Sequence, residues 1–398
     1  MNHDAGTIRE WPLDTAGVPA QMILNKDAFN PAVNGLRGLC ALMIFVFHVF
    51  NSGIVPWPNG SHFADVFTYV IGSLRYGVEL FFMISGFVIV ASLTRHANIP
   101  VFFRDRATRI FSLWVPLHIG ICIAGTLWGW KVFPHVVDAQ GWWQVFLANL
   151  LLIAPFVNVA TTHPASWSLS YEWLFYFSAA MTYFAYRRGG RGWALLTAVT
   201  TAALYVECMP RALYFIPGVL TFLALKQQVD LKKYLVAPLL SFCVFLLAWS
   251  ATGVDAADPG HYFSYWFGDY RIVMAAVAFM AGLHFFCTLA YRSSPQLRFL
   301  ETRFFEVMGS ISFSFYLVSP IVMFGVKKIV YAQMAHVFHP WAMLACFAGF
   351  SLIASLAAAY VTWSLFENRL ARYLKGFSRA RKRALPGDIR LCKNASGL

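Results

Sequence analysis

Two ionisable side chains share one face of the first apolar run of this sequence. Arg37 and His48 are eleven residues apart, and eleven residues at about 100° each complete three turns of an α-helix. At about 1.5 Å per residue, they would lie about 16 Å apart along the helix axis. A charge inside a bilayer costs about 2.5–3.5 kcal/mol, so it needs a partner, a cavity or a function. The pair therefore predicts a polar path through a bundle of helices.

His48 is the strongest candidate for proton transfer among the histidines of the apolar runs. A neutral imidazole accepts protons near pH 7, and burial among apolar residues favours its uncharged form. His118 and His284 also fall in apolar runs but have no cation in helical phase with them. We expect structural roles for those two histidines.

A basic segment comes directly before the third apolar run. It contains Arg104, Arg106 and Arg109, and the last two are neighbours on a helix surface, where they could clamp a phosphate. Retention of positive charge in cytoplasmic loops explains the charge equally well. It does not explain arginine at all three positions, because lysine would serve that purpose.

Two other segments carry polar residues at the ends or small residues in the middle of apolar runs. Glu79 opens the second run, and Ser85 with Gly86 would admit either a ligand or another helix, with helix packing favoured. In the fourth run, Ser168 or Ser170 can cap the helix start and Glu172 complements its positive end. The Glu172 carboxylate is also predicted to reach the depth of His48.

The composition identifies a membrane protein. Of 398 residues, 59% are hydrophobic and 12% are charged, whereas soluble domains carry roughly 25% charged residues. Apolar runs near the ~20 residues needed to cross a bilayer recur along the chain. We predict an all-α polytopic protein with about ten transmembrane helices, at residues 35–52, 76–94, 108–130, 167–186, 192–208, 212–226, 234–250, 270–290, 305–325 and 341–366.

The placement of basic residues sets the predicted orientation. With the N-terminus inside, 24 Lys and Arg residues fall on the cytoplasmic side and 6 on the other side, so both termini are expected in the cytoplasm. The net charge of +13 then reflects orientation, and we expect no nucleic-acid partner. We divide the chain into a cytoplasmic segment (1–34), a transmembrane domain (35–366) and a basic cytoplasmic tail (367–398).

One apolar stretch, from Trp142 to Val157, does not fit as a further span. Counting it would place Arg187, Arg188 and Arg191 on the outer side and reverse the charge bias that follows. We therefore predict a re-entrant or interfacial segment. The seven cysteines have no metal-ligand spacing, so we expect neither a disulfide nor a metal site.

Five blocks, in order along the chain, resemble the acyltransferase-3 family of integral membrane acyltransferases. The blocks are Asn34-Gly35-Leu36-Arg37-Gly38-Leu39 with His48, Gly77-Val78-Glu79-Leu80-Phe81-Phe82 with Ser85-Gly86-Phe87, Arg106-Ala107-Thr108-Arg109-Ile110, Trp167-Ser168-Leu169-Ser170 with Glu172, and Ser312-Phe313-Ser314-Phe315-Tyr316-Leu317. Two positions depart from the family pattern. Ser319 stands where members often have His, and Trp173 where many have a second acid.

The resemblance implies a membrane O-acyltransferase of the plasma (inner) membrane. It would move an acyl group, usually acetyl, from cytoplasmic acyl-CoA to a hydroxyl of an extracytoplasmic glycan or glycolipid. Acyl-CoA would be a co-substrate, and no cofactor would be bound permanently. Membrane lipid is a further expected partner, and a second copy of the chain or polysaccharide-assembly proteins stay open as partners.

Under this hypothesis the candidate residues take defined roles. His48 would be the general base on the acceptor hydroxyl, oriented by Glu172 or Glu79, and an acyl-histidine intermediate stays open. Arg37 would stabilise the oxyanion or hold the donor, and its distance from His48 favours the second role. The other predicted site residues bind the donor (Arg104, Arg106, Arg109, Ser85 and Gly86) or support the site (Glu79, Trp167, Ser170 and Tyr316).

Two other classes of function stay open at this point. In a transporter or flippase for a glycan or lipid, Arg37, His48 and Glu172 would line a translocation path without covalent chemistry. The sequence has no related halves, which argues against that class. A membrane scaffold within a polysaccharide-export assembly would need none of these side chains.

Overall fold

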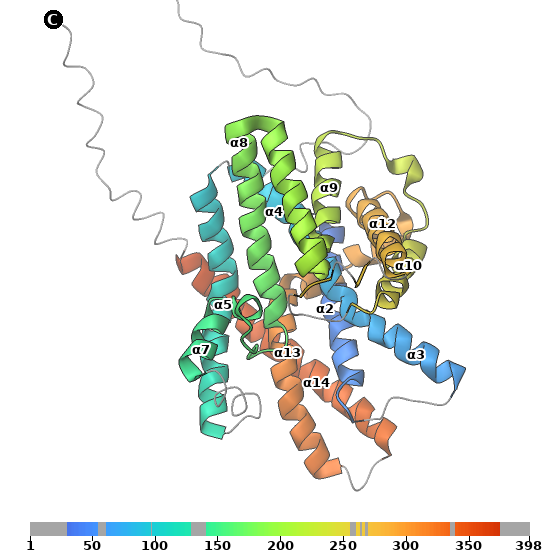
Figure 1. Cartoon of the computed structure of the whole chain (residues 1–398). Helices are drawn as coiled ribbons and strands as arrows, with labels where there is room; N and C mark the ends of the chain where they lie inside the picture. The colour runs from blue at the N-terminus through green and yellow to red at the C-terminus, as the bar shows by residue number, and fades with distance from the viewer. Residues whose placement is uncertain are drawn as a thin grey trace, which may run out of the picture.

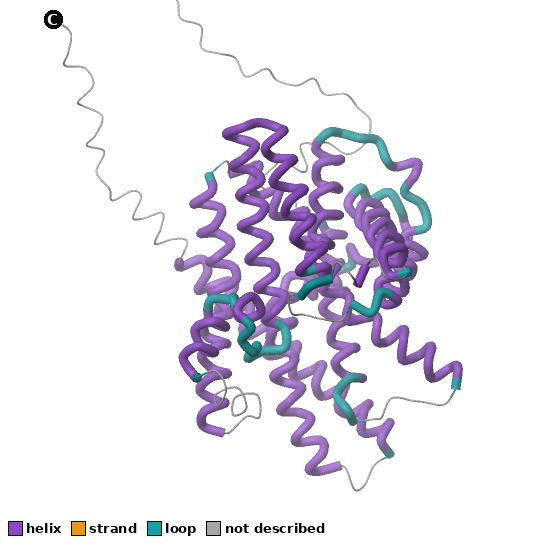
Figure 2. Tube along the Cα trace, in the orientation of Figure 1, coloured by secondary structure: helices purple, strands orange, loops and turns teal. Residues whose placement is uncertain are grey.

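A computed structural model of the chain describes residues 30–54, 61–96, 98–128, 141–254, 260–262, 265–266, 270–334 and 339–374. Within these ranges the regular structure is entirely helical, which confirms the all-α prediction (Figure 2). The predicted N-terminal segment and basic tail lie mostly outside the described residues. The helices are α2 (Pro31–Phe50), α3 (His62–Ser73), α4 (Gly77–His96), α5 (Ile99–Trp128), α7 (Trp142–Leu150), α8 (Ser166–Cys208), α9 (Phe215–Lys226), α10 (Pro238–Ala251), α12 (Arg271–Ala290), α13 (Arg303–Met334) and α14 (Pro340–Thr362).

Every predicted span coincides with a helix, but the helices differ in their capacity to cross a membrane. Six helical segments of the described chain are long and apolar enough: Pro31–Phe50, His62–Arg95, Ile99–Leu127, Arg271–Ala290, Arg303–Ile329 and Pro340–Leu374. The chain is therefore a polytopic membrane protein by length and composition. α9 has 12 residues and α10 has 14, so each is shorter than the ~30 Å hydrocarbon core.

Two of the predicted spans form one kinked element. Residues 167–186 and 192–208 are the two arms of α8, which reverses at Gly190, where φ is 78° and ψ is −161°. Figure 1 shows the arms side by side, running away from and back toward the middle of the molecule. Glycine adopts this positive φ without steric cost. The exposed residues Arg187, Arg188 and Arg191 lie at the reversal.

The stretch predicted not to span contains a helix of only nine residues, α7. At about 1.5 Å per residue it is too short to cross a bilayer, in agreement with the prediction. α7 lies along α5 (Figure 1). The Trp114 indole of α5 donates to Asn149 O at 3.1 Å, and His118 Nε2 lies 3.1 Å from Phe146 O. These buried polar contacts hold the segment against the bundle.

Glycines bring the central helices into close contact. An ideal Cβ at Gly218 of α9 would lie 1.8 Å from Met83 O of α4, and one at Gly86 of α4 would lie 2.0 Å from Phe215 O. At Gly309 of α13, it would lie 2.0 Å from Asn34 O of α2. Backbones can approach this closely only where the side chain is absent. The glycines therefore fix the positions of α2 and α4, the helices that carry Arg37 and Ser85.

Gly218→Ala should destabilise the folded protein because its methyl group would overlap the α4 backbone. Overpacking of this kind costs about 1–3 kcal/mol. Gly120→Ala on α5 is the matched control, since nothing lies within 4 Å of its added Cβ. Thermal unfolding of the purified proteins in detergent measures the difference. Equal melting temperatures for the two variants would contradict the proposed close packing.

Candidate active site

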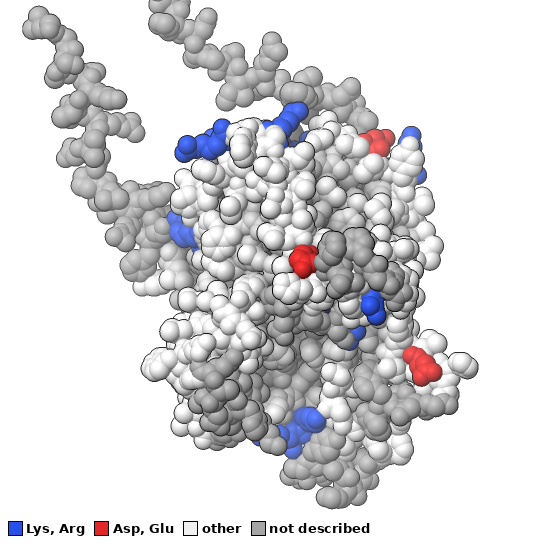
Figure 3. Space-filling model, viewed as in Figure 1, with Lys and Arg blue, Asp and Glu red and all other residues white. Residues whose placement is uncertain are grey.

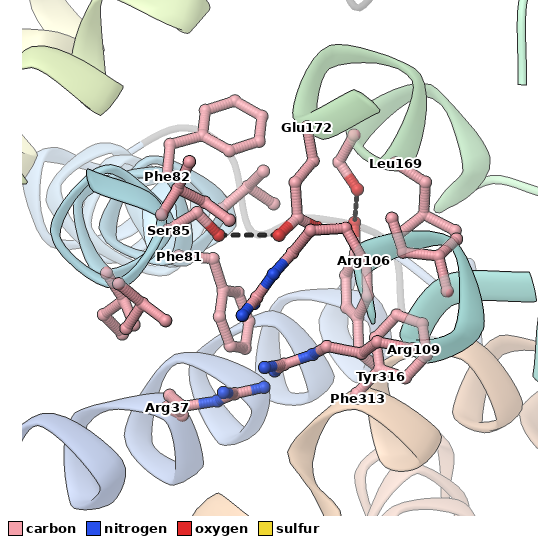
Figure 4. Close-up of a pocket in the computed structure, with 16 residues that line it drawn as sticks. Arg37, Phe81, Phe82, Ser85, Arg106, Arg109, Leu169, Glu172, Phe313 and Tyr316 are labelled. Atoms are coloured by element: carbon pink, nitrogen blue, oxygen red, sulfur yellow. Dashed lines mark hydrogen bonds between the residues drawn. The ribbon is translucent and has the colours of Figure 1, made fainter. Parts of the chain in front are cut away.

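A cavity lies where α2, α4, α5, α8 and α13 meet. It encloses about 700 Å³ of empty space, part of which is open to the exterior. Figure 4 shows charged side chains from separate helices directed into it. Its polar lining consists of Arg37, Ser85, Arg106, Arg109, Ser168, Glu172 and Tyr316.

Three guanidinium groups converge in this cavity (Figure 4). Arg37 Nε donates to Ser312 Oγ at 3.4 Å, and Arg106 Nη2 donates to Ser92 Oγ at 3.2 Å. Among the described residues, Arg106 Nε is buried without a hydrogen-bond partner, and the Arg109 side chain donates no hydrogen bond. Much of the donor capacity of the three side chains is thus free for a ligand.

Two carboxylates balance part of this positive charge. Glu172 Oε1 accepts hydrogen bonds from Ser85 Oγ at 2.8 Å and from Tyr176 Oη at 2.6 Å. The charge of Glu172 acts on Arg37 and Arg106. Glu367 accepts a hydrogen bond from Ser314, and its charge acts on Arg37 and Arg109. Three cations against two anions leave one net positive charge.

From the sequence alone, Glu367 was placed in the basic tail and was not recognised as a partner of the arginines. It lies in a π-helical segment, Trp363–Leu370, that continues α14. Such segments are rare, and they occur frequently at functional sites. Glu367 is the single acid between Glu306 and Asp388. An isolated acid at the end of an apolar run is the signal that could have identified it.

His48 lies near the C-terminal end of α2, separate from the lining of the arginine cavity. Its side chain is half-buried, and neither ring nitrogen forms a hydrogen bond with a described residue. Both nitrogens of this imidazole are therefore free to accept or donate a proton.

Three other buried or half-buried histidines of the described chain have both ring nitrogens occupied. His118 pairs with Phe146 O and Thr162 Oγ1, at 3.1 and 3.2 Å. His284 pairs with Ser241 Oγ and Tyr234 O, at 2.7 and 3.1 Å. His163 pairs with Leu317 O at 2.8 Å and accepts from the amide of Ala165 at 3.0 Å. These contacts agree with the structural roles expected for His118 and His284.

Glu79 does not orient His48, because other partners occupy its carboxylate. Arg211 Nε and Nη2 donate to its two oxygens at 2.6 and 3.1 Å, and Trp249 Nε1 donates at 3.1 Å. Both charged side chains are buried. The Arg211 guanidinium also lies 4.3 Å from the Trp167 ring centroid. Glu79 therefore forms a buried ion pair with Arg211 that joins α4 to the segment before α9, and Trp167 packs against this pair.

The expected contact between Glu172 and His48 is also absent among the described side chains. Because α8 begins at Ser166, Glu172 lies in the second turn of the helix and not at its end. From this position it points toward α4 and the arginines (Figure 4). Glu172 lines the arginine cavity, and its hydrogen-bond partners are Ser85 and Tyr176, not the predicted His48.

The remaining predicted residues divide into those inside and those outside the cavity. Tyr316 lines it, with its hydroxyl 3.0 Å from Ser168 Oγ. Gly86 packs against α9 and does not line the cavity. Ser170 Oγ donates to Ser166 O within α8. Arg104 pairs with the neighbouring Asp105 at 3.1 Å, outside the cavity.

Comparison with known proteins decides the class of the chain. The family model described as "Acyltransferase domain" (Acyl_transf_3) matches residues 30–360, which include the cavity residues Arg37 to Tyr316. The chain belongs to the acyltransferase-3 family. The cavity at the meeting point of its central helices is the candidate active site of this acyltransferase. Among the described residues, no group of three or more His, Cys, Asp or Glu could hold a metal ion.

Two relatives are consistent with this family. Acyltransferase MdmB of Streptomyces mycarofaciens is 24% identical over 85% of this acyltransferase and 89% of its own length. Nodulation protein 10 of Rhizobium leguminosarum bv. viciae is 28% identical over 33% of this chain and 39% of its own length. No solved structure matches the chain.

Glu79→Gln should unfold the acyltransferase at a markedly lower temperature because Arg211 would keep its buried charge without a counter-charge. Breaking a buried pair in this way costs about 3–5 kcal/mol. Glu306→Gln breaks the exposed Arg303–Glu306 pair and should cost less than about 1 kcal/mol. Thermal unfolding in detergent checks both variants. A stable Glu79→Gln protein would contradict the assigned structural role.

Proposed function

We propose that this acyltransferase transfers an acyl group, acetyl in the simplest case, from cytoplasmic acyl-CoA to a hydroxyl of an extracytoplasmic glycan or glycolipid. The observation that carries the proposal is the convergence of Arg37, Arg106 and Arg109 on one cavity (Figure 4). Three cations brought together in a bundle interior favour a polyanionic ligand, and acyl-CoA carries three phosphate groups.

The arginines suit the phosphates of the donor. A guanidinium forms paired hydrogen bonds with phosphate oxygens and stays charged when it is partly buried. Arg106 Nε has no hydrogen-bond partner in the described part of the chain, so phosphate binding would satisfy it. Because Arg37 lines the same cavity as Arg106 and Arg109, it acts in donor binding and not as an oxyanion ligand beside His48.

His48 suits the acceptor. The imidazole takes the proton of the acceptor hydroxyl as its oxygen attacks the thioester carbonyl. The carbon–sulfur bond then breaks, and the protonated imidazole returns the proton to the departing thiolate of CoA. Attack by His48 itself, giving an acyl-imidazole that the hydroxyl then cleaves, uses the same two groups. Glu172 serves as counter-charge and positioning group for the arginines in both schemes.

The proposal places the chain in the plasma (inner) membrane with ten crossings and both termini in the cytoplasm. Basic side chains gather where α8 reverses, at the upper end of the molecule in Figure 3. Short cytoplasmic loops retain such residues. The two arms of α8, α9 with the preceding segment Pro210–Tyr214, and α10 would supply the crossings beyond the six long apolar segments. A bilayer thins locally around a short span, which would accommodate α9 and α10.

The assay for this function uses purified protein, acyl-labelled acetyl-CoA and a panel of glycans and glycolipids. Covalent label on an acceptor, with release of one CoA thiol for each acyl group transferred, is the expected result. A transporter or flippase would move the acceptor across a vesicle membrane without releasing thiol. That result would overturn the proposal.

His48→Gln should lower the rate of acyl transfer by roughly 10²–10⁴, the usual contribution of a general base. The folded protein and its affinity for acyl-CoA should be unchanged, because His48 lies away from the arginine cavity. Rates of thiol release, measured alongside thermal unfolding, test this. His261→Gln, at an exposed position, is the control and should keep full activity. Undiminished transfer by His48→Gln would reject the role.

Arg106→Gln and Arg109→Gln should each raise the KM for acyl-CoA roughly 10–100-fold, the loss expected for a charge-assisted hydrogen bond. The acceptor KM should change little. Arg104→Gln is the matched control from the same basic segment. Its side chain pairs with Asp105 outside the cavity, so its donor KM should stay near the wild-type value. Equal effects at all three positions would contradict the assigned cavity site.

A further inference from the structure

A second hollow lies on the flank of the bundle, between α5 and the two arms of α8. This groove holds about 620 Å³ of empty space, much of it open to the exterior. Its walls include Phe103 of α5, Phe177, Met181 and Phe184 of the first arm, and Thr197 of the second arm. Thr197 is its one polar lining residue, and its hydroxyl donates to Trp193 O at 2.9 Å. The groove therefore offers an apolar ligand surface and nothing for a polar ligand.

An aromatic floor separates the groove from the arginine cavity. The Phe103 ring lies 4.8 Å from Phe177 and 6.1 Å from Trp173, centroid to centroid. Trp173 in turn lies 5.9 Å from Tyr176, which donates to Glu172. The groove is thus a separate site that shares one wall with the cavity.

One end of the groove is cationic. The Arg188 guanidinium carbon lies 5.2 Å from the centroid of the Phe184 ring, a groove residue. Arg187 and Arg191 lie at the same reversal, and all three are exposed. None of them forms an ion pair with an acid of the described chain. Figure 3 shows basic side chains gathered at this end of the molecule.

We propose that the groove binds an acyl chain of an anionic phospholipid, whose phosphate lies against Arg187 and Arg188. Hydrocarbon matches the apolar walls, and the negative headgroup matches the unpaired arginines at the end of the groove. Basic pockets between transmembrane helices select anionic lipids in this way. The proposal depends on the membrane fold and not on the proposed reaction.

The test compares phosphatidylglycerol with phosphatidylcholine of identical acyl chains. The full-length protein is purified in detergent, delipidated and titrated with each lipid, and bound lipid is counted by native mass spectrometry. Wild-type protein should hold one phosphatidylglycerol per chain with at least roughly tenfold preference over phosphatidylcholine. It should also unfold at a higher temperature when that lipid is present, because the lipid binds the folded state. Equal binding of the two lipids would overturn the proposal.

Matched variants locate the headgroup and the chain. Arg187→Gln with Arg188→Gln should remove the preference, roughly tenfold in affinity ratio, without changing the lipid-free melting temperature. Lys232→Gln with Lys233→Gln, an exposed basic pair on the loop between α9 and α10, should keep the preference. Ala185 also lines the groove, so Ala185→Leu would fill part of it and should weaken the binding of both lipids. The headgroup site is refuted if the arginine variant still prefers phosphatidylglycerol, or if the lysine control loses that preference to the same extent. Unaltered lipid binding by Ala185→Leu refutes the groove as the site of the acyl chain.

Discussion

The structure depends on holding like charges together inside an apolar bundle. Arg37 of α2 and Arg106 and Arg109 of α5 project into one cavity, where their mutual repulsion is weakly screened. Glu172 and Glu367 offset part of that repulsion. The balance is incomplete by one charge and leaves guanidinium donors unbonded. That residual positive charge makes the cavity the candidate binding site, whereas a closed structural network would have its charges balanced.

The buried ion pair between α4 and the segment before α9 contrasts with the arginine cavity, because its charges are balanced. Arg211 and Glu79 satisfy each other through two hydrogen bonds, and Trp249 and Trp167 complete their surroundings. Nothing in that arrangement calls for a ligand. The same comparison separates the histidines, because His118, His163 and His284 are fully hydrogen-bonded whereas His48 is not. Unmet hydrogen-bonding capacity, and not the presence of charge, distinguishes the candidate catalytic groups.

Close contacts between helix backbones hold the helices around the arginine cavity in position. Glycines let α4 meet α9 and let α2 meet α13 at distances that any side chain would prevent. Those contacts leave little freedom for the helices that carry Arg37 and Ser85. α5 and α8 line both hollows, the arginine cavity around Arg106 and Glu172 and the apolar groove around Phe103 and Phe177.

The sequence by itself determined the membrane class, the helical segments, the family resemblance and most of the polar cavity residues. These follow from local properties. The length of an apolar run indicates a membrane span, and the helical period places residues such as Arg106 and Arg109 on one face of a helix. Only the tertiary structure decided the pairings between helices. It joined Glu79 to Arg211, 132 residues away, brought Glu367 back to the arginines, and turned Gly86 toward α9. Spacing along the chain carries no information on such partners, since they depend on how separate helices rotate and pack against one another.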